Sequence, residues 1–331
     1  MTVKKKQYQK WAFGEIFFTI SAIFLLLLLL KNPELAADAV SSALLQCAKL
    51  LIPSLFPIMV ASEIAVESGA AEFITRPLNG LLARILGVKK EAASPYFLGL
   101  LGGYTTSVCG ILSLYKNGKI SKEDCERMVA LSSLPSLSFL TGFAGNGIFK
   151  STTIGWILWA ISIFSTLILG FFTQKRHKKG KLTAGRIHPV MRDENSKKAI
   201  SKSAISASKI IVGAISHSAG AMIVICGCVV FFSTLIAVLH CPIDALNMPE
   251  NIQNLALGSL EITNGISSTA SISPLSLRAA SCGFFIGWSG LSVHFQIISL
   301  CDGYDLSFKK YFLYKAIQGA ICCLVSWIVF M

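Results

Sequence analysis

Apolar runs long enough to cross a bilayer alternate with short polar connections along most of this chain. A membrane-spanning helix needs about 20 mostly apolar residues, because each residue adds about 1.5 Å to its length. Uninterrupted or merely kinked spans are predicted at 12–30, 39–66, 152–173, about 219–239 and 311–331. The pattern therefore predicts an all-α, polytopic integral membrane protein.

Three further apolar segments carry small or polar residues near their centres, at 95–115, 128–147 and 280–300. The first of them holds four glycines and a Tyr-Thr-Thr-Ser run. Glycine-interrupted hydrophobic segments are typical of the discontinuous helices of transporters. We expect these segments to be broken or re-entrant helices.

Two stretches are too polar to be ordinary spans. Residues 72–90 alternate leucines with Arg and Lys, which favours a helix in the membrane interface or half of a re-entrant hairpin. Residues 203–218 are also polar, and we expect them to lie at the interface before a span that starts near Ala219.

The two halves of the chain contain similar segments. Residues 97–121 (FLGLLGGYTTSVCGILSLYKNGKIS) can be aligned with residues 284–307 (FFIGWSGLSVHFQIISLCDGYDLS), although identity is low and chance similarity stays open as the alternative. Duplicated halves with broken segments in matching positions point to a transporter with its site at the repeat interface. We divide the chain into an N-terminal membrane anchor (1–38), a first repeat (39–173), a basic loop (174–202) and a second repeat (203–331).

Charge is scarce but unevenly placed. The net charge is +13, although only 14% of residues are charged and 53% are hydrophobic. The basic clusters flank apolar segments at the N-terminus and at 174–202, and the larger one, at 174–202, lacks the aromatic residues typical of nucleic-acid binding. The positive-inside rule places both clusters in the cytoplasm. The ten cysteines lie mostly in apolar stretches without CxxC spacing, so we expect neither a disulfide framework nor a metal site.

Two groups of residues could bind a solute inside the membrane. Glu261 is ionisable in an otherwise apolar segment, where it would contact a cation, a proton or a solute hydroxyl; an interfacial position is the alternative. The Gly102–Ser107 turn would expose backbone N–H groups at the positive end of a half-helix, which suits a carboxylate or a nucleobase edge. Tight helix packing through small residues is the other interpretation of this turn.

The candidate substrate-binding residues share broken, polar positions in apolar segments. They are Gly102, Gly103, Tyr104, Thr105, Thr106, Ser107, Glu261, Thr263, Asn264, Gly265, Ser292, His294 and Gln296. For His294 a buried imidazole bonded to a carbonyl is an equal alternative. No GxSxG, HExxH or Walker motif is present, so we expect no enzyme, no catalytic residue and no cofactor.

Four segments give the chain a resemblance to a known family. They are SLFPIMVASEIAV (54–66), LGGYTTSVCG (101–110), GSLEITNGI (258–266) and GLSVHFQIISL (290–300). With these segments the chain resembles the YlbJ-type sporulation integral membrane proteins, which carry the nucleoside-recognition Gate domain also found in concentrative nucleoside transporters. The family has a proline after the Gly-Tyr of the second segment, where this chain has Thr105.

The resemblance implies two Gate-type repeats and a role in endospore formation, in a membrane around the forespore. It also implies transport of dipicolinate or a related solute. The leading prediction is therefore transport of a small polar or anionic solute, in which half-helix ends meet its charge and a coupling ion, if there is one, uses Glu261. The expected partners are this small-molecule solute and membrane lipids, while a homo-oligomer is left open. A spore-assembly scaffold recruiting partners through the basic loop, a nucleoside-type transporter and, more weakly, a membrane enzyme acting on a lipid-linked substrate are the alternatives.

Overall fold

A computed structural model describes residues 19–68, 70–174, 207–244, 247 and 249–331, and all of its regular structure is helical. Short helix Thr19–Lys31 comes first. The others are α2 (Pro33–Gln46), η1 (Cys47–Leu51), α3 (Ile52–Glu67), α4 (Ala70–Leu86), α5 (Lys90–Gly102), α6 (Tyr104–Lys116), α7 (Lys122–Ser132), η2 (Phe139–Phe149), α8 (Thr152–Thr173), α9 (Ala207–Asp244), α10 (Glu250–Gly258), α11 (Ile262–Ser268), η4 (Thr269–Ser271), α12 (Leu275–Trp288), α13 (Gly290–Leu300) and α14 (Lys309–Val329). Of these, η1 and η2 are π-helical and η4 is a 3₁₀ turn.

Five stretches within the described residues are long and apolar enough to cross a membrane. They are Pro33–Ala65, Thr152–Thr173, Ala207–His240, Leu275–Leu300 and Lys309–Val329. The all-α, polytopic class is thereby confirmed. Residues 1–18 of the predicted anchor and 175–202 of the predicted basic loop lie outside the described residues.

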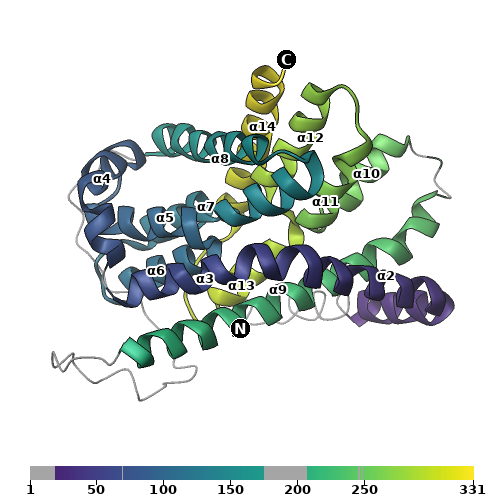
Figure 1. Cartoon of the computed structure of the whole chain (residues 1–331), viewed down its shortest axis with the longest axis horizontal. Helices are drawn as coiled ribbons and strands as arrows, with labels where there is room; N and C mark the ends of the chain where they lie inside the picture. Colours follow the sequence, from purple (N-terminus) through teal and green to yellow (C-terminus); the bar gives the residue numbers. More distant parts are fainter. Residues whose placement is uncertain (1–18, 69, 175–206, 245–246, 248) are drawn as a thin grey trace, which may run out of the picture.

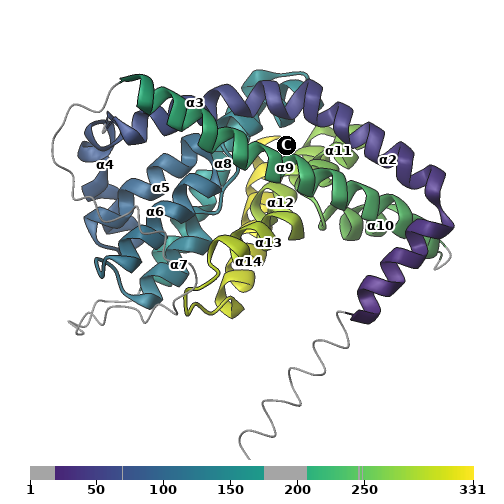
Figure 2. The same cartoon turned by 90° about the horizontal axis from the view of Figure 1, so that it is seen from below.

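No helix end separates the expected interface segment from the span predicted to start near Ala219. The chain continues from Ala207 to Asp244 as one helix, α9, whose only proline is Pro242 near its end. The polar residues at its start are compatible with helix, because no proline interrupts the backbone hydrogen bonds there. This helix lies against both α2 and α3 (Figures 1 and 2).

Both repeat segments are broken at or directly beside a glycine. In the first half α5 ends and α6 begins around Gly103, which has φ +91°. In the second half α12 and α13 meet at Ser289 and Gly290, with φ +75° and +81°. A residue in this region of φ cannot continue a right-handed helix, and glycine adopts it without a steric penalty. The expected helix breaks are therefore present at equivalent positions.

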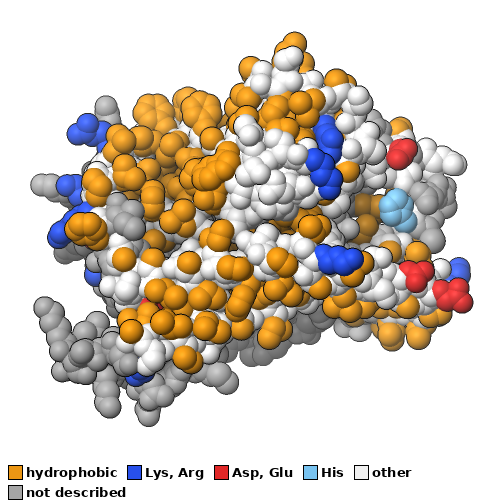
Figure 3. Space-filling model, viewed as in Figure 1, with side chains coloured by type: hydrophobic (Ala, Val, Ile, Leu, Met, Phe, Trp, Pro, Cys, Tyr) orange, Lys and Arg blue, Asp and Glu red, His pale blue; other side chains and the backbone are white. Residues whose placement is uncertain are grey.

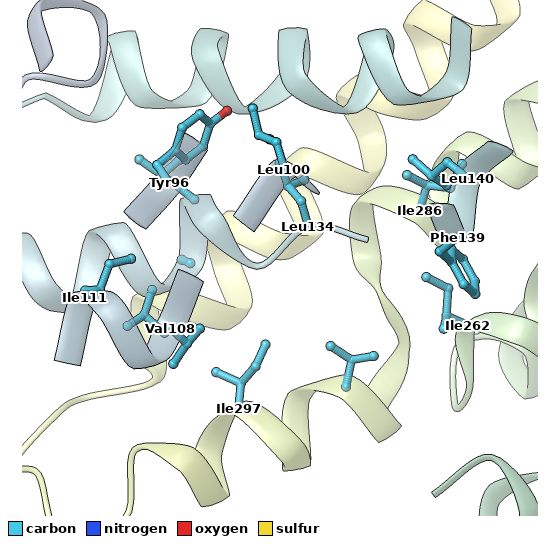
Figure 4. Close-up of a cluster of buried hydrophobic side chains, with 14 of the residues drawn as sticks. Tyr96, Leu100, Val108, Ile111, Leu134, Phe139, Leu140, Ile262, Ile286 and Ile297 are labelled. Atoms are coloured by element: carbon cyan, nitrogen blue, oxygen red, sulfur yellow. The ribbon is translucent and has the colours of Figure 1, made fainter. Parts of the chain in front are cut away.

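The broken helices of the two halves pack against each other. Helix α6 contacts α13, and η2 contacts α11. Figure 4 shows part of the shared core, in which Val108 and Ile297 come from the first pair and Phe139 and Ile262 from the second. Because the cores of the two halves are continuous, residues far apart in sequence meet between the helix breaks.

The outer surface is dominated by apolar side chains. Figure 3 shows hydrophobic groups over most of one face, with most of the visible charged groups towards its two edges. Large exposed apolar residues occur on α8 and α9, among them Phe172 and Ile223 at 78% and 73% exposure. Such a surface is unfavourable in water and is suited to lipid.

A buried arginine joins α4 to α7. Gly87, with φ +59°, ends α4, and the Arg127 guanidinium donates to Leu86 O at 2.6 Å and to Gly87 O at 2.9 Å. Asp124 lies 3.7 Å from the same guanidinium. Arg127 thus satisfies carbonyls that the end of α4 leaves without helical partners.

Substitution of Arg127 by leucine is expected to lower the stability of the folded protein. Each buried carbonyl left without a donor costs about 1–3 kcal/mol. Thermal unfolding in detergent should show a clear decrease in Tm for Arg127→Leu and little change for the control Arg84→Leu, because Arg84 is exposed on α4. Equal Tm values for the two variants would contradict this role.

Candidate functional site

A pocket lies between the helix breaks of the two halves. Most of its apolar lining residues come from η1, α3, η2 and α9. Most of its polar lining residues come from the α5–α6 junction, the start of α11 and the α12–α13 junction. The lining residues are Leu51, Leu55, Met59, Gly102, Gly103, Tyr104, Thr105, Pro135, Ser136, Phe139, Ile225, Val229, Glu261, Ile262, Thr263, Ser289, Ser292, Val293 and Gln296.

The N-terminus of α6 faces this pocket. Gly103, Tyr104 and Thr105 line it, and the first hydrogen bond into α6 runs from Ser107 N to Gly103 O at 3.4 Å. The N–H groups of residues 104–106 precede that bond, as at any helix N-terminus. They carry part of the positive end of the helix dipole and can donate to an anionic or carbonyl group of a solute.

The second half-helix end is used differently. Leu291 N donates to Ser259 O at 3.0 Å, and Ser292 N donates to Leu260 O at 2.9 Å. The Trp288 indole also donates to Ser259 O, at 2.9 Å. The chain's own carbonyls therefore occupy the start of α13, so of the two expected solute-binding ends only that of α6 keeps its N–H groups for a solute.

Glu261 brings a carboxylate into the pocket wall. It is the N-cap of α11 and only 1% exposed. Its Oε2 accepts hydrogen bonds from Asn264 N at 2.8 Å, from Asn264 Nδ2 at 3.0 Å and from the Thr263 hydroxyl. Asn264 Nδ2 also donates to Ser233 Oγ of α9 at 2.7 Å. The carboxylate is therefore held by α11 and is linked through Asn264 to the long helix α9.

A single hydrogen bond connects the broken helices across the pocket. The Tyr104 hydroxyl of α6 donates to Gln296 Oε1 of α13, and Gln296 Nε2 donates to Ser292 Oγ at 3.3 Å. All three residues line the pocket. The first of these hydrogen bonds joins the two halves of the protein at their helix breaks, and a solute in the pocket would contact the residues that form them both.

The structure brings eight of the thirteen predicted residues to the pocket wall. They are Gly102, Gly103, Tyr104, Thr105, Glu261, Thr263, Ser292 and Gln296.

The other five predicted residues lie behind the wall. Thr106 packs on Gly102, Ser107 packs on Gly99, and Gly265 packs on Gly258 and Phe285. Asn264 holds Glu261, as described above. These residues support the pocket and do not line it.

His294 also lies away from the pocket. It is fully buried, its Nδ1 is 2.8 Å from the Tyr311 hydroxyl, and its ring contacts Trp288 and Phe312 edge to face. Its Nε2 is buried without a hydrogen-bond partner in the described structure. His294 is therefore bonded to a tyrosine hydroxyl, whereas the alternative from sequence had a carbonyl as its partner.

Sequence reasoning missed a buried polar pair in α14. Lys315 and Gln318 are both fully buried, and Lys315 Nζ lies 2.9 Å from Gln318 Oε1. The available signal was a Lys and a Gln three residues apart in an otherwise apolar span. Because residues three apart lie on one helix face, this spacing predicts a polar strip on a buried helix.

The pocket is electrostatically simple. Among the described lining residues Glu261 is the one acidic side chain. None of the described lining residues is a Lys or Arg that could balance a bound anion. The positive potential in the pocket therefore comes from the N-terminal end of the α6 dipole. The arrangement can accept a solute with hydrogen-bonding groups and an apolar ring against Phe139 and Val293.

Comparison with known proteins identifies a relative over almost the whole chain. The chain is 22% identical over 330 residues to the sporulation integral membrane protein YlbJ of Bacillus subtilis (strain 168), covering 92% of this chain and 81% of the relative. The predicted resemblance to the YlbJ-type family is confirmed. No protein-family model matches the chain, and no solved structure matches it.

The segments that carry the YlbJ-type resemblance meet in the structure. Residues 54–66 form most of α3, 101–110 the α5–α6 junction, 258–266 the start of α11, and 290–300 helix α13. Each of the four contributes lining residues to the pocket. The family likeness and the pocket therefore involve the same parts of the molecule.

Proposed function

We propose that this protein transports a small polar solute across a membrane during endospore formation. The observation that carries the proposal is the pocket between two broken helices, where the open N-terminus of α6 and Glu261 lie on one wall. Broken helices that surround a polar pocket are the usual binding sites of secondary transporters. The sporulation context is supported by the similarity to YlbJ.

The preferred solute is dipicolinate or a related aromatic carboxylate. Its carboxylates would accept hydrogen bonds from the N–H groups at the start of α6, and its ring would pack on the apolar wall. An ionised Glu261 would repel such an anion in a site of low dielectric constant. Transport of this solute therefore requires a proton or another cation at Glu261, which makes this residue the proposed site of a coupling ion.

A neutral nucleoside-type solute is the second candidate. It is favoured by the fact that Glu261 is the one acidic side chain lining the pocket within the described residues. A carboxylate can accept hydrogen bonds from ribose hydroxyls or a base edge without a counter-charge. The Tyr104–Gln296 pair would offer further donors and acceptors.

Uptake into proteoliposomes tests the proposal. We expect the purified protein to accumulate labelled dipicolinate or labelled uridine above protein-free vesicles. Gln296→Leu should reduce the transported solute's uptake roughly 2- to 12-fold, because a neutral hydrogen bond contributes about 0.5–1.5 kcal/mol. The matched control is Gln46→Leu, which removes an amide that donates to Ser267 Oγ at 3.4 Å outside the pocket.

The outcomes separate transport from the scaffold alternative. Absence of uptake of either solute by the wild-type protein would contradict the proposal. Deleting residues 178–198, in the basic loop outside the described residues, should leave uptake nearly unchanged if the protein is a transporter. A scaffold would instead lose its partners with that loop and would show no dependence on Gln296.

A further inference from the structure

Lys315 is a cation buried inside the terminal span of the protein. It lies in α14, and its side chain is fully buried. Its Nζ donates to Ser133 O of the first half at 2.8 Å and to Gln318 Oε1 at 2.9 Å. Isolated charges in a membrane interior are costly, so an ionisable residue there usually serves a function.

No carboxylate balances Lys315 among the described residues. The helices packed on α14 are α7, α8 and α12, and α13 approaches it through the bond between His294 and Tyr311. Helix α8 has no charged residue. Besides the carboxylates of α7, the ionisable groups on these helices are Lys122, Cys125, Arg127, Arg278, Cys282, His294, Lys309, Lys310, Tyr311, Tyr314, Cys322 and Cys323.

Two carboxylates of α7 have other partners. Asp124 accepts from Ser121 and pairs with Arg127, and Glu126 accepts from Ser307 N at 2.8 Å. All three carboxylates of α7, Glu123 included, precede Ser133 by seven to ten residues, which is about two helical turns or more. The partners of the Lys315 ammonium are therefore a helix C-terminal carbonyl and an amide oxygen, which are weaker partners than a carboxylate.

The carbonyl that accepts from Lys315 belongs to the wall of the pocket. Ser133 ends α7 and begins the short segment that leads to η2, in which Pro135 and Ser136 line the pocket. Ser136 in turn packs beside Gly103, the break between α5 and α6. Lys315 is thus joined through a few residues to the helix end that would bind the solute.

We propose that Lys315 carries a proton in addition to the coupling ion proposed at Glu261. It would link solute movement to a pH gradient by holding the wall segment 133–138, which includes Pro135 and Ser136 of the pocket, when protonated and releasing it when neutral. This inference rests on the proposed transport function. The affinity of the amine for its proton depends on whether Ser133 O and Gln318 Oε1 stay in position. By thermodynamic linkage, protonation of the amine must then shift the equilibrium between the held and the released wall by the same coupling free energy.

Two variants separate the proton from the hydrogen bond. Lys315→Met removes both the charge and the hydrogen-bond donor. Methionine is chosen because an apolar side chain of similar length fills the buried site without placing an unpaired charge there. Lys315→Arg keeps a donor whose proton cannot be released, because the guanidinium stays charged at all accessible pH values. The matched control is Lys89→Met, which removes a half-buried lysine whose Nζ donates to Lys119 O at 2.8 Å; neither residue lines the pocket.

Proteoliposomes provide two readouts for each variant, with labelled dipicolinate and labelled uridine as the probes. One is exchange of solute at equal pH on both sides, and the other is accumulation driven by an imposed pH gradient. Wild type and Lys89→Met should show both. Lys315→Met and Lys315→Arg should exchange solute at a rate within about threefold of the wild-type rate. Their gradient-driven accumulation should be at least tenfold lower than that of the wild type.

The results distinguish this inference from the function on which it rests. If the wild-type protein shows no exchange of either probe, the transport function itself fails. If the wild-type protein exchanges a probe but a pH gradient drives no accumulation, the role of Lys315 is overturned and transport stands. Gradient-driven accumulation by Lys315→Arg at the wild-type level would also overturn it, and this variant serves as the test even if Lys315→Met does not fold.

Discussion

Substitution of Gly290 by alanine is expected to destabilise the protein and to abolish solute binding. A Cβ at this position would lie 2.8 Å from Ile262 N and 3.2 Å from the backbone of Glu261. The residue also has φ +81°, where an L-amino acid is strained by about 1–2 kcal/mol. Overpacking against rigid backbone adds about 1–3 kcal/mol, so the expected loss is about 2–5 kcal/mol. The start of α11 must move to relieve the contact, and Glu261 moves with it.

The turn glycine Gly303 offers a matched control. It has φ +79°, yet nothing lies within 4 Å of its added Cβ, so Gly303→Ala introduces the strain without the clash. Thermal unfolding in detergent should place Gly290→Ala well below Gly303→Ala in Tm, and only Gly290→Ala should lose binding of labelled dipicolinate or uridine. Similar Tm values and intact binding in both variants would show that the α12–α13 break is not packed against α11 as described.

Substitution of Glu261 is expected to have the largest effect on transport itself. Glu261→Ala removes the carboxylate and the N-cap of α11, which costs about 0.5–2 kcal/mol of stability. A hydrogen bond that a solute donates to an ionised carboxylate contributes about 1.5–3 kcal/mol, so uptake should fall roughly 10- to 150-fold. Glu261→Gln keeps an oxygen that can accept from Asn264 N but removes the charge.

The two Glu261 variants divide the effect into its parts. If the residue carries the coupling ion, Glu261→Gln should retain exchange of solute while losing ion-driven accumulation, whereas Glu261→Ala should lose both. Glu250→Gln is the control, since Glu250 also lies at a helix start but is exposed. Wild-type uptake by Glu261→Ala would remove this carboxylate from the mechanism.

The helix breaks show which part of the fold was accessible from sequence. Gly102-Gly103 and Ser289-Gly290 interrupt runs that are otherwise apolar, and glycine is the residue that tolerates the backbone angles of a break. The continuity of α9 was not accessible. Ser, His and Gly residues between 203 and 218 suggested an interface segment, but from Ala207 onwards the backbone is helical, and α9 has contacts with α2 and α3 that no local pattern reveals.

The candidate site shows the same division. Glu261 and the Gly-Tyr-Thr turn could be named because they are polar groups in apolar surroundings, and their meeting in one pocket agrees with the alignment of the two halves. His294 stood out for the same reason, yet the structure turns it away from the pocket towards Tyr311. Direction along a helix depends on which neighbours pack against each face, so sequence alone could not separate these two kinds of residue.

By itself, the sequence determined a membrane protein of helices, the positions of its two breaks and the short list of polar groups inside it. These follow from local physics, since apolar length sets a span and glycine permits a break. Only the tertiary structure decided that the start of α6 stays open while Ser259 and Leu260 occupy the start of α13, and that Lys315 meets Ser133. Such contacts join residues separated by long stretches of chain, and they exist only once the helices have packed.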